Sequence, residues 1–288
     1  MLFGRRDQFV YAECAACASL QIREVPANLA DYYPTDYYSY DLPESVQKPP
    51  EFFRRLASWL ITALPGCTPL TRRLAWRYPF LHWARLGAIG HRDAVLDVGC
   101  GAGVELHRMR RWGYSNLTGI DPYMRKESRE PELILSRATL DEIDGRFALI
   151  MMNHVLEHLP DPGAALRAAR DRLQPGGRIL VRLPIAGSPL ARAFGADWFA
   201  LDPPRHLVIP SRAGFLKLSA NNGLVIRHEE YDSTELSILY SECYRKNIPV
   251  KEAPKPGTPA DRKRALRRIK RMNARGEGDC GLFVLTTV

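Results

Sequence analysis

Three titratable residues stand together in the stretch MMNHVLEHLPDP. His154, Glu157 and His158 spell H-x-x-E-H, a pattern with which one class of proteases binds zinc through two imidazoles on one helix. Such a helix would have to continue, but two prolines follow at once, and the preceding FALIMM has the pattern of a strand. The zinc-protease interpretation is therefore disfavoured, and the three side chains are predicted to follow the end of a strand.

A strand, a glycine turn and a helix start are predicted in VLDVGCGAGVEL, whose glycines are Gly99, Gly101 and Gly103. Glycines let a backbone approach a ligand, and the N-terminus of the helix offers unpaired N–H groups. The dinucleotide fingerprint needs Gly or Ala at position 104, where this chain has Val104, which weakens the case for NAD. Asp97 would repel a pyrophosphate but attract a ligand that carries an ammonium and a sulfonium, as S-adenosylmethionine does.

Asp121 ends the next predicted strand, NLTGID, where a carboxylate can accept hydrogen bonds from both ribose hydroxyls of a cofactor. From Ala94 onward, short apolar strands alternate with helical stretches, a pattern that predicts a parallel sheet with right-handed crossovers. Two later strands, GLVIRHEEY and GLFVLTTV, are separated by a proline-rich link and a basic helical stripe. A helical arm is therefore predicted before the last strand.

These motifs together resemble those of the class I S-adenosylmethionine-dependent methyltransferases. VLDVGCGAG is similar to their first motif, GID to their ribose-binding acid, FALIMMNHVLEHLPDP to their fourth strand and turn, and LQPGGRILVRLP to their fifth strand. The resemblance covers about two thirds of the chain. It implies an α/β, Rossmann-like sheet of seven strands, with the last strand antiparallel and S-adenosylmethionine across the carboxyl edge of the first strands.

The resemblance also implies a set of site residues. For the cofactor, these residues are Asp97, Gly99, Gly101 and Gly103, with Asp121 on the ribose, Ala138, Thr139 and Leu140 beside the adenine, and Asn153. The PPRH loop is similar to a stretch that closes over the acceptor pocket. His206 is accordingly expected to be the general base that takes the acceptor's proton, while Glu157 and His158 orient the acceptor or tune that base.

The N-terminal region departs from the subgroup that it resembles. In that subgroup two C-x-x-C knuckles bind zinc before a Tyr-Tyr segment, whereas only Cys14 and Cys17 are present here, so no zinc is predicted. Some relatives build a magnesium site on E-x-x-E-H, but His154 replaces the first Glu, and no metal is predicted there either. The tyrosines of DYYPTDYYSYD are interpreted either as a lid over the cofactor or as aromatic packing.

Five segments are predicted along the chain. They are a Cys/Tyr-rich cap over 1–45, a helical segment over 46–90 with helices at 51–64 and 71–87, a methyltransferase core over 91–239, a basic helical arm over 240–278 and a last core strand over 279–288.

Composition bounds the competing functions. The 288 residues carry a formal net charge of +9 and are 45% hydrophobic, and no apolar run approaches the length that spans a bilayer. Scattered cysteines favour a reducing cytoplasm. Because 261–275 holds eight Lys and Arg and one Asp, the basicity is local and a nucleic-acid partner is disfavoured.

The leading hypothesis is transfer of a methyl group from S-adenosylmethionine to a small molecule, at an oxygen of a sugar or glycan precursor. The alternatives are an RNA methyltransferase that uses the 261–275 arm, and a non-catalytic binding protein that keeps the fold.

Overall fold

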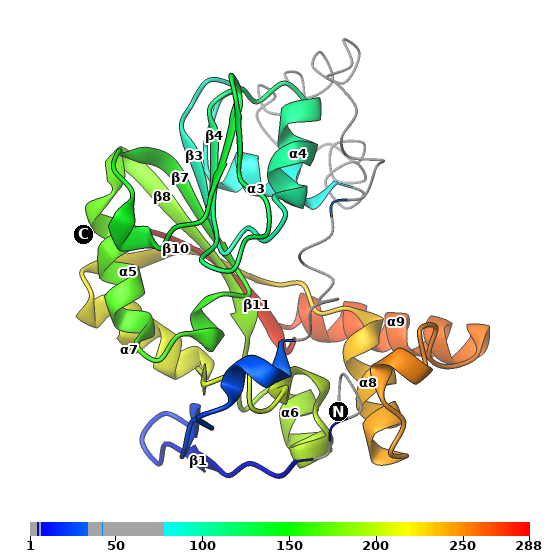
Figure 1. Cartoon of the computed structure of the whole chain (residues 1–288). Helices are drawn as coiled ribbons and strands as arrows, with labels where there is room; N and C mark the ends of the chain where they lie inside the picture. The colour runs from blue at the N-terminus through cyan, green and yellow to red at the C-terminus, as the bar shows by residue number, and fades with distance from the viewer. Residues whose placement is uncertain (1–4, 6, 34–41, 43–77) are drawn as a thin grey trace.

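The computed structural model describes residues 5, 7–33, 42 and 78–288 (Figure 1). The strands of this part are β1 (Tyr11–Glu13), β2 (Leu20–Ile22), β3 (Val95–Val98), β4 (Leu117–Ile120), β5 (Ser128–Glu130), β6 (Leu133–Ser136), β7 (Phe147–Asn153), β8 (Leu173–Pro184), β9 (Val208–Ile209), β10 (Leu224–Tyr231) and β11 (Cys280–Thr287). Its α-helices are α3 (Pro79–Leu86), α4 (Val104–Arg111), α5 (Pro162–Asp171), α6 (Pro189–Phe194), α7 (Arg212–Asn221), α8 (Glu235–Arg245) and α9 (Pro259–Ala274). The helix predicted over 51–64 and most of the tyrosine-rich stretch lie outside the described residues.

The larger sheet has the order β10-β11-β8-β7-β3-β4-β6-β5. Strands β6, β4, β3, β7 and β8 run parallel, and β11 is antiparallel to both of its neighbours, β8 and β10. The predicted Rossmann-like α/β fold with an antiparallel last strand is therefore confirmed. The sheet has one strand more than the seven predicted, because the short β5 adds an antiparallel edge beside β6.

Helices cover both faces of this sheet (Figure 1). On one face α3 and α4 bury Phe80, Leu81 and Met109 against apolar residues of the strands. On the other face α5 and α7 bury Leu166 and Phe215. Because the central strands are buried on both faces, they read as nearly continuous apolar runs.

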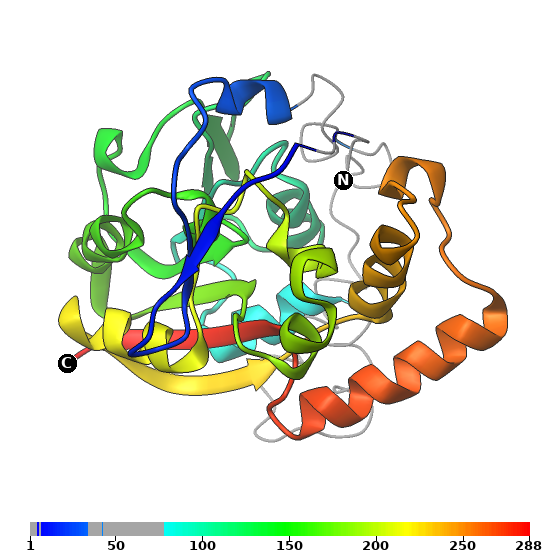
Figure 2. The same ribbon diagram turned by 90° about the horizontal axis from the view of Figure 1, so that it is seen from below.

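The basic arm packs through its apolar stripe. In α9, Ala265, Ile269 and Met272 are buried in a third cluster that also contains Ile238 and Leu239 of α8. Figure 2 shows α9 beside α8 at the periphery of the molecule. The arm is therefore inserted between β10 and β11, as predicted.

No helix in the described ranges has both the length and the apolar character needed to cross a membrane.

The N-terminal residues form a small second sheet with the loop that contains PPRH. Strand β2 pairs antiparallel with β1 on one side and with β9 on the other. Cys14 and Cys17 lie in the tight turn between β1 and β2, where the Cys14 carbonyl accepts hydrogen bonds from the N–H groups of Cys17 and Ala18. This hairpin therefore holds the loop that carries His206.

Candidate active site

The glycine turn between β3 and α4 adopts a backbone that other residues rarely take. Gly99, Gly101 and Gly103 have φ values of 68°, 55° and 74°, all in the left-handed region. A side chain on Gly99 would also meet Val155 Cγ2 at 2.7 Å. The turn can therefore present bare backbone and the N-terminus of α4 to a ligand, as the sequence predicts.

Three carboxylates gather around this turn. Asp97 and Asp121, at the ends of β3 and β4, are only 5% and 9% exposed, and Glu105 lies in the first turn of α4. Burial raises the pKa of Asp97 well above its usual value, and the charges of Glu105 and Asp121 raise it further. Burial also raises the pKa of Glu105. A site that concentrates unfavourable negative charge in this way fits a cationic ligand.

Backbone donors hold the Asp121 carboxylate in place. One oxygen accepts a hydrogen bond from the Gly101 N–H at 3.0 Å, and the other accepts one from the Tyr123 N–H at 2.8 Å. Because each carboxylate oxygen has two lone-pair sites, both oxygens can still accept hydroxyl donors. Asp121 therefore belongs to the same turn as the glycines.

Asn153 ends β7, the strand beside β3. Its amide nitrogen and oxygen are both buried, and neither has a hydrogen-bond partner in the structure. Buried polar groups are almost always paired, and this amide can bind a ligand without giving up a partner in the protein.

The predicted adenine neighbours follow β6. Leu140 is buried in the core, whereas Thr139 is exposed and forms a capping box with Glu142 at the start of a 3-10 helix, Leu140–Glu142. Ala138 is partly buried against the same apolar cluster. The side chains of Thr139 and Leu140 thus have structural roles of their own, and a ligand would meet this segment mainly through its backbone.

The H-x-x-E-H residues follow directly on Asn153, in a 3-10 turn over Leu156–His158. Glu157 is fully buried, and His154 Nδ1 donates a hydrogen bond to its carboxylate at 3.0 Å. Burial opposes ionisation of Glu157, but this hydrogen bond and the neighbouring imidazoles lower its pKa to about 2. Glu157 therefore stays ionised and fixes the His154 ring.

The imidazoles of His158 and His206 lie against each other, with ring centroids 4.7 Å apart and planes at 70°. His158 Nδ1 donates to the Arg205 carbonyl at 3.0 Å, and His206 Nδ1 donates to the Ala200 carbonyl at 2.8 Å. Because a carbonyl oxygen can only accept, each ring carries its proton on Nδ1 and keeps a lone pair on Nε2. Burial and the neighbouring His158 lower the pKa of His206 to about 4, so His206 is neutral at physiological pH.

Hydrogen bonds from the N-terminal segment and from Leu207 stabilise the positions of His158 and His206. The Tyr11 hydroxyl donates to the His206 carbonyl at 2.7 Å, and the Leu207 N–H donates to the Glu157 carbonyl at 2.7 Å. The Tyr33 hydroxyl lies 3.3 Å from His158 Nδ1, and its ring stacks on that of Tyr123. The structure therefore brings Glu157, His158 and His206 together, as the sequence predicts.

Comparison with known proteins decides the family. A model described as "Methyltransferase domain" matches residues 77–229, more than half of the chain. This chain belongs to the class I S-adenosylmethionine-dependent methyltransferases. This match begins at residue 77 and does not include the region that resembles the cysteine-knuckle subgroup.

Relatives of this methyltransferase include enzymes named ubiquinone biosynthesis O-methyltransferase. One from Pseudomonas aeruginosa strain UCBPP-PA14 is 31% identical over 136 residues, 42% of this chain and 57% of that protein. Another from Aeromonas salmonicida is 33% identical over 162 residues, 49% of this chain and 66% of that protein. The chain thus spans little more than half the length of the first of these relatives.

A solved structure also shares the fold. A chain from the complex between the Haloferax volcanii Trm112 methyltransferase activator and a methyltransferase has a TM-score of 0.50 at 16% identity, over 75% of this chain and 92% of that chain.

The residues of this methyltransferase fit the family's methyl donor. S-adenosylmethionine carries a sulfonium and an ammonium, which suit the three carboxylates at the glycine turn, and it offers polar groups for the orphaned Asn153 amide. The predicted cofactor residues Asp97, Gly99 and Asp121 therefore share one place at the carboxyl edge of β3, β4 and β7.

Sequence reasoning missed several residues of this methyltransferase. Glu105 could have been suspected, because it is an acid in the first turn after the glycine loop. Arg182 of β8 donates a hydrogen bond to His154 Nε2 at 2.9 Å, and Tyr11 contacts His206 across 195 positions of the chain. No local pattern identifies these two residues, because their partners are set by strand pairing.

Two clusters in the described ranges could hold a metal ion. Glu157, His158 and His206 form one, with ligand atoms within 4.8 Å of one another, although the sequence predicts no metal here. His82, His228 and Glu230 form the other, which no sequence pattern predicted.

Proposed function

We propose that this chain methylates a hydroxyl oxygen of a small molecule, with His206 as general base. The observation that carries the proposal is the continuity of one short segment. Asn153, whose buried amide lacks partners, is followed within five residues by His158, which contacts His206. The groups that fit the donor and the groups that could handle a proton therefore meet at the end of β7.

The chemistry requires alignment and removal of one proton. S-adenosylmethionine, when bound, supplies a methyl group on a sulfonium that leaves as a neutral thioether. The Nε2 lone pair of His206 takes the hydroxyl proton, and the resulting imidazolium would be stabilised by the Asp202 carboxylate, 3.8 Å from that nitrogen. The Ala200 carbonyl holds the ring in the required tautomer.

Glu157 and His158 act as positioning residues in this proposal. Glu157 is ionised and buried, and its hydrogen bond from His154 fixes the turn that carries His158. His158 Nε2 keeps a lone pair and can accept a hydrogen bond from the acceptor.

The relatives support oxygen as the methylated atom, because they are named O-methyltransferases. They do not support the sugar or glycan precursor that the sequence suggested. A base with a pKa of about 4 also favours an acidic hydroxyl. A phenol ionises near a pKa of about 10, as tyrosine does, far more readily than a group like water with a pKa of about 15.7. We therefore place phenolic hydroxyls ahead of sugar hydroxyls.

The test is a methylation screen followed by one substitution. Small phenols and nucleotide sugars would be incubated with the protein and S-adenosylmethionine, and methylated products identified by mass spectrometry. For the acceptor that reacts, His206→Gln should lower kcat by roughly 100- to 10,000-fold and leave the Kd for S-adenosylmethionine unchanged. Because the pKa of His206 is about 4, the wild-type rate should lose its dependence on this group above that pH, rather than near the usual 6.5.

His91→Gln is the matched control, because His91 stacks on Tyr114 before β3, away from this cluster. An undiminished rate for His206→Gln, with normal melting and donor binding, would exclude His206 as the base. Reaction of sugars alone would restore the sugar acceptor.

A further inference from the structure

A second histidine and carboxylate cluster lies outside the active site, where α3 meets the edge strand β10. His82 Nε2 lies 2.7 Å from Glu230 Oε1, and His228 Nε2 lies 3.0 Å from Glu230 Oε2. In the order of the sheet, β11 and β8 separate β10 from the catalytic strand β7. The proposed methyl transfer uses none of these three residues.

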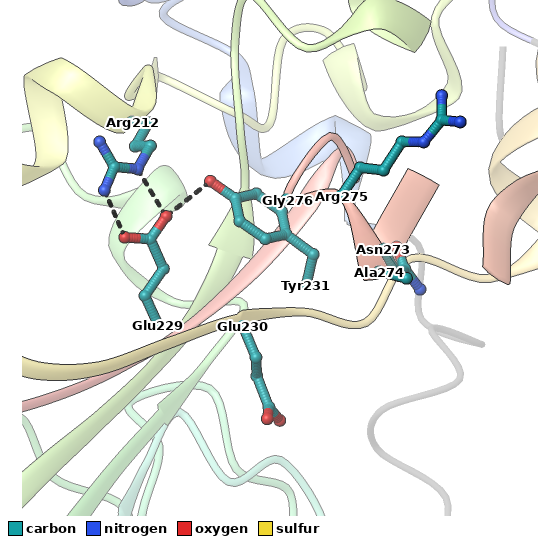
Figure 3. Close-up of a pocket in the computed structure, with 8 residues that line it drawn as sticks. All are labelled: Arg212, Glu229, Glu230, Tyr231, Asn273, Ala274, Arg275 and Gly276. Carbon is teal, nitrogen blue, oxygen red and sulfur yellow. Dashed lines mark hydrogen bonds and ion pairs between the residues drawn. The ribbon is translucent and has the colours of Figure 1, made fainter. Parts of the chain in front are cut away.

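The backbone aims two of these side chains to the same face. Positions 228 and 230 are two residues apart in β10, so their side chains lie on the same face of the strand. The register with β11 shifts between Ile226 and His228. Such bulges re-aim side chains and are common beside functional sites. Figure 3 shows Glu230 pointing away from Glu229 and Tyr231, which are bonded to each other on the opposite face of β10.

That opposite face is a weaker candidate. A hollow of about 900 Å³ lies there, lined in part by Arg212, Glu229, Tyr231 and Arg275 (Figure 3). The Glu229 carboxylate already accepts hydrogen bonds from Arg212 and from the Tyr231 hydroxyl. The side chains of Arg212, Glu229 and Tyr231 therefore satisfy one another.

We propose that His82, His228 and Glu230 bind a divalent transition metal, with Zn²⁺ as the representative ion. Their ligand atoms all lie within 4.8 Å of one another, and all three residues are partly buried. Imidazole nitrogen suits zinc, copper, iron and nickel, whereas calcium and magnesium prefer oxygen ligands alone. Two histidines and one glutamate leave a coordination position for water.

The present spacing is close to what zinc requires. With bonds of about 2.0 to 2.1 Å in a tetrahedral arrangement, neighbouring ligand atoms stand about 3.4 Å apart. The distances from His82 Nε2 to Glu230 Oε1 and from His228 Nε2 to Glu230 Oε2, 2.7 and 3.0 Å, would have to open by about 0.7 and 0.4 Å. Each Nε2 must also present its lone pair, so the metal replaces the two hydrogen bonds.

Neighbouring charge moderates the affinity. His228 also lines a hollow of about 460 Å³ together with Arg85, Arg178 and Arg227. Arg178 donates to the Leu86 carbonyl and Arg227 donates to the Thr286 hydroxyl, which keeps their positions defined. Their positive charge opposes a bare dication, so we expect a modest affinity.

The consequence of binding would be structural. His82 belongs to α3, whereas His228 and Glu230 belong to the edge strand β10. Glu230 lies 148 positions after His82 in the chain. A metal that bridges them would fasten α3 to β10 and stabilise only the folded chain. The sequence predicts no metal at Cys14 and Cys17 or at the H-x-x-E-H residues. The zinc site proposed here uses three other residues.

The experiment is zinc titration of the full chain labelled with ¹⁵N-histidine, after treatment with a chelator. One equivalent of Zn²⁺ should shift the Nε2 resonances of His82 and His228 together, and Mg²⁺ should shift neither. Because NMR reports each ring separately, binding at His158 and His206 is distinguished. Glu230→Gln should weaken zinc binding at His82 and His228 by at least about tenfold. It should also abolish the rise in Tm that zinc binding at these two residues produces.

Glu229→Gln is the matched control, since its side chain points to the other face of the same strand (Figure 3). Unmoved His82 and His228 resonances at a tenfold excess of zinc would overturn the proposal. So would an equal loss of affinity in Glu229→Gln and Glu230→Gln. If Glu230→Gln fails to fold, the wild-type resonances decide alone.

Discussion

Asp97 illustrates at the scale of one residue how the site opposes the stability of the fold. It is almost fully buried, and burial together with Glu105 and Asp121 raises its pKa. Between its ordinary pKa of 3.8 and the raised value, the unfolded chain has released this proton while the folded chain retains it. The contribution of Asp97 to stability therefore falls as pH rises through that window, and stays low above it.

Asp97→Asn should raise the Tm at neutral pH and weaken the binding of S-adenosylmethionine. Asparagine keeps the shape of the side chain and removes the unfavourable charge. Loss of a charge-assisted interaction worth roughly 1.5 to 3 kcal/mol should weaken donor binding by at least about tenfold. Differential scanning calorimetry and titration calorimetry measure the two effects.

Asp93→Asn provides the control, because its exposed carboxylate merely accepts a hydrogen bond from the Gly90 N–H before the same strand. Below the ordinary pKa of 3.8 the wild type and Asp97→Asn should melt alike. A lower Tm for Asp97→Asn at neutral pH would show that the charge is not destabilising.

At the scale of elements, the hairpin β1–β2 and the short strand β9 hold the loop of His206. The Tyr11 hydroxyl reaches the His206 carbonyl, and the Ser211 N–H donates to the Ser19 hydroxyl. These contacts join segments that lie almost 200 positions apart in the chain. The position of the base thus depends on the N-terminal region.

The second prediction is that Tyr11→Phe impairs the reaction without touching the donor. Removing one hydrogen bond should cost about 0.5 to 1.5 kcal/mol of stability. Because the loop of His206 loses an anchor, kcat should fall several-fold while the Kd for S-adenosylmethionine stays constant. Steady-state kinetics with the identified acceptor, and thermal melts, provide the measurements.

Tyr32→Phe is the matched control, since the Tyr32 hydroxyl bonds the exposed Asp7 carboxylate. Equal losses of kcat in the two variants would argue against a special role for Tyr11.

The elements also show how far sequence reasoning extends. Strands β3, β4, β6, β7 and β8 could be predicted because parallel strands covered on both faces are continuous apolar runs, and the glycine turn followed from its special backbone. Short pieces such as β5 and β9 carry no periodic signal, since each is formed by pairing with a neighbour. The convergence of His158 and His206 was predicted only through family resemblance, and that of His82 with Glu230 not at all.

The whole molecule separates its charge from its packing. Much of the net charge of +9 lies on α9, whose apolar stripe is buried against α8 while its cationic side chains face outward. The same helix therefore offers two independent experiments. One tests its role in folding, and the other tests the nucleic-acid alternative.

The last prediction concerns the two faces of α9. Ile269→Ala should destabilise the chain by about 2 to 5 kcal/mol, because Ile269 is buried in the cluster with α8. Arg267→Gln, Arg268→Gln and Arg271→Gln should each change the free energy of unfolding by less than about 0.5 kcal/mol, since these side chains are exposed. We combine them in a triple variant. Denaturant unfolding measures both.

Small-molecule methylation should be unaffected by the triple variant, because the proposed site lies at the ends of β3, β4 and β7. Loss of RNA binding or of RNA methylation in that variant, with steep dependence on salt in the wild type, would instead make α9 a phosphate-contacting helix and favour an RNA acceptor.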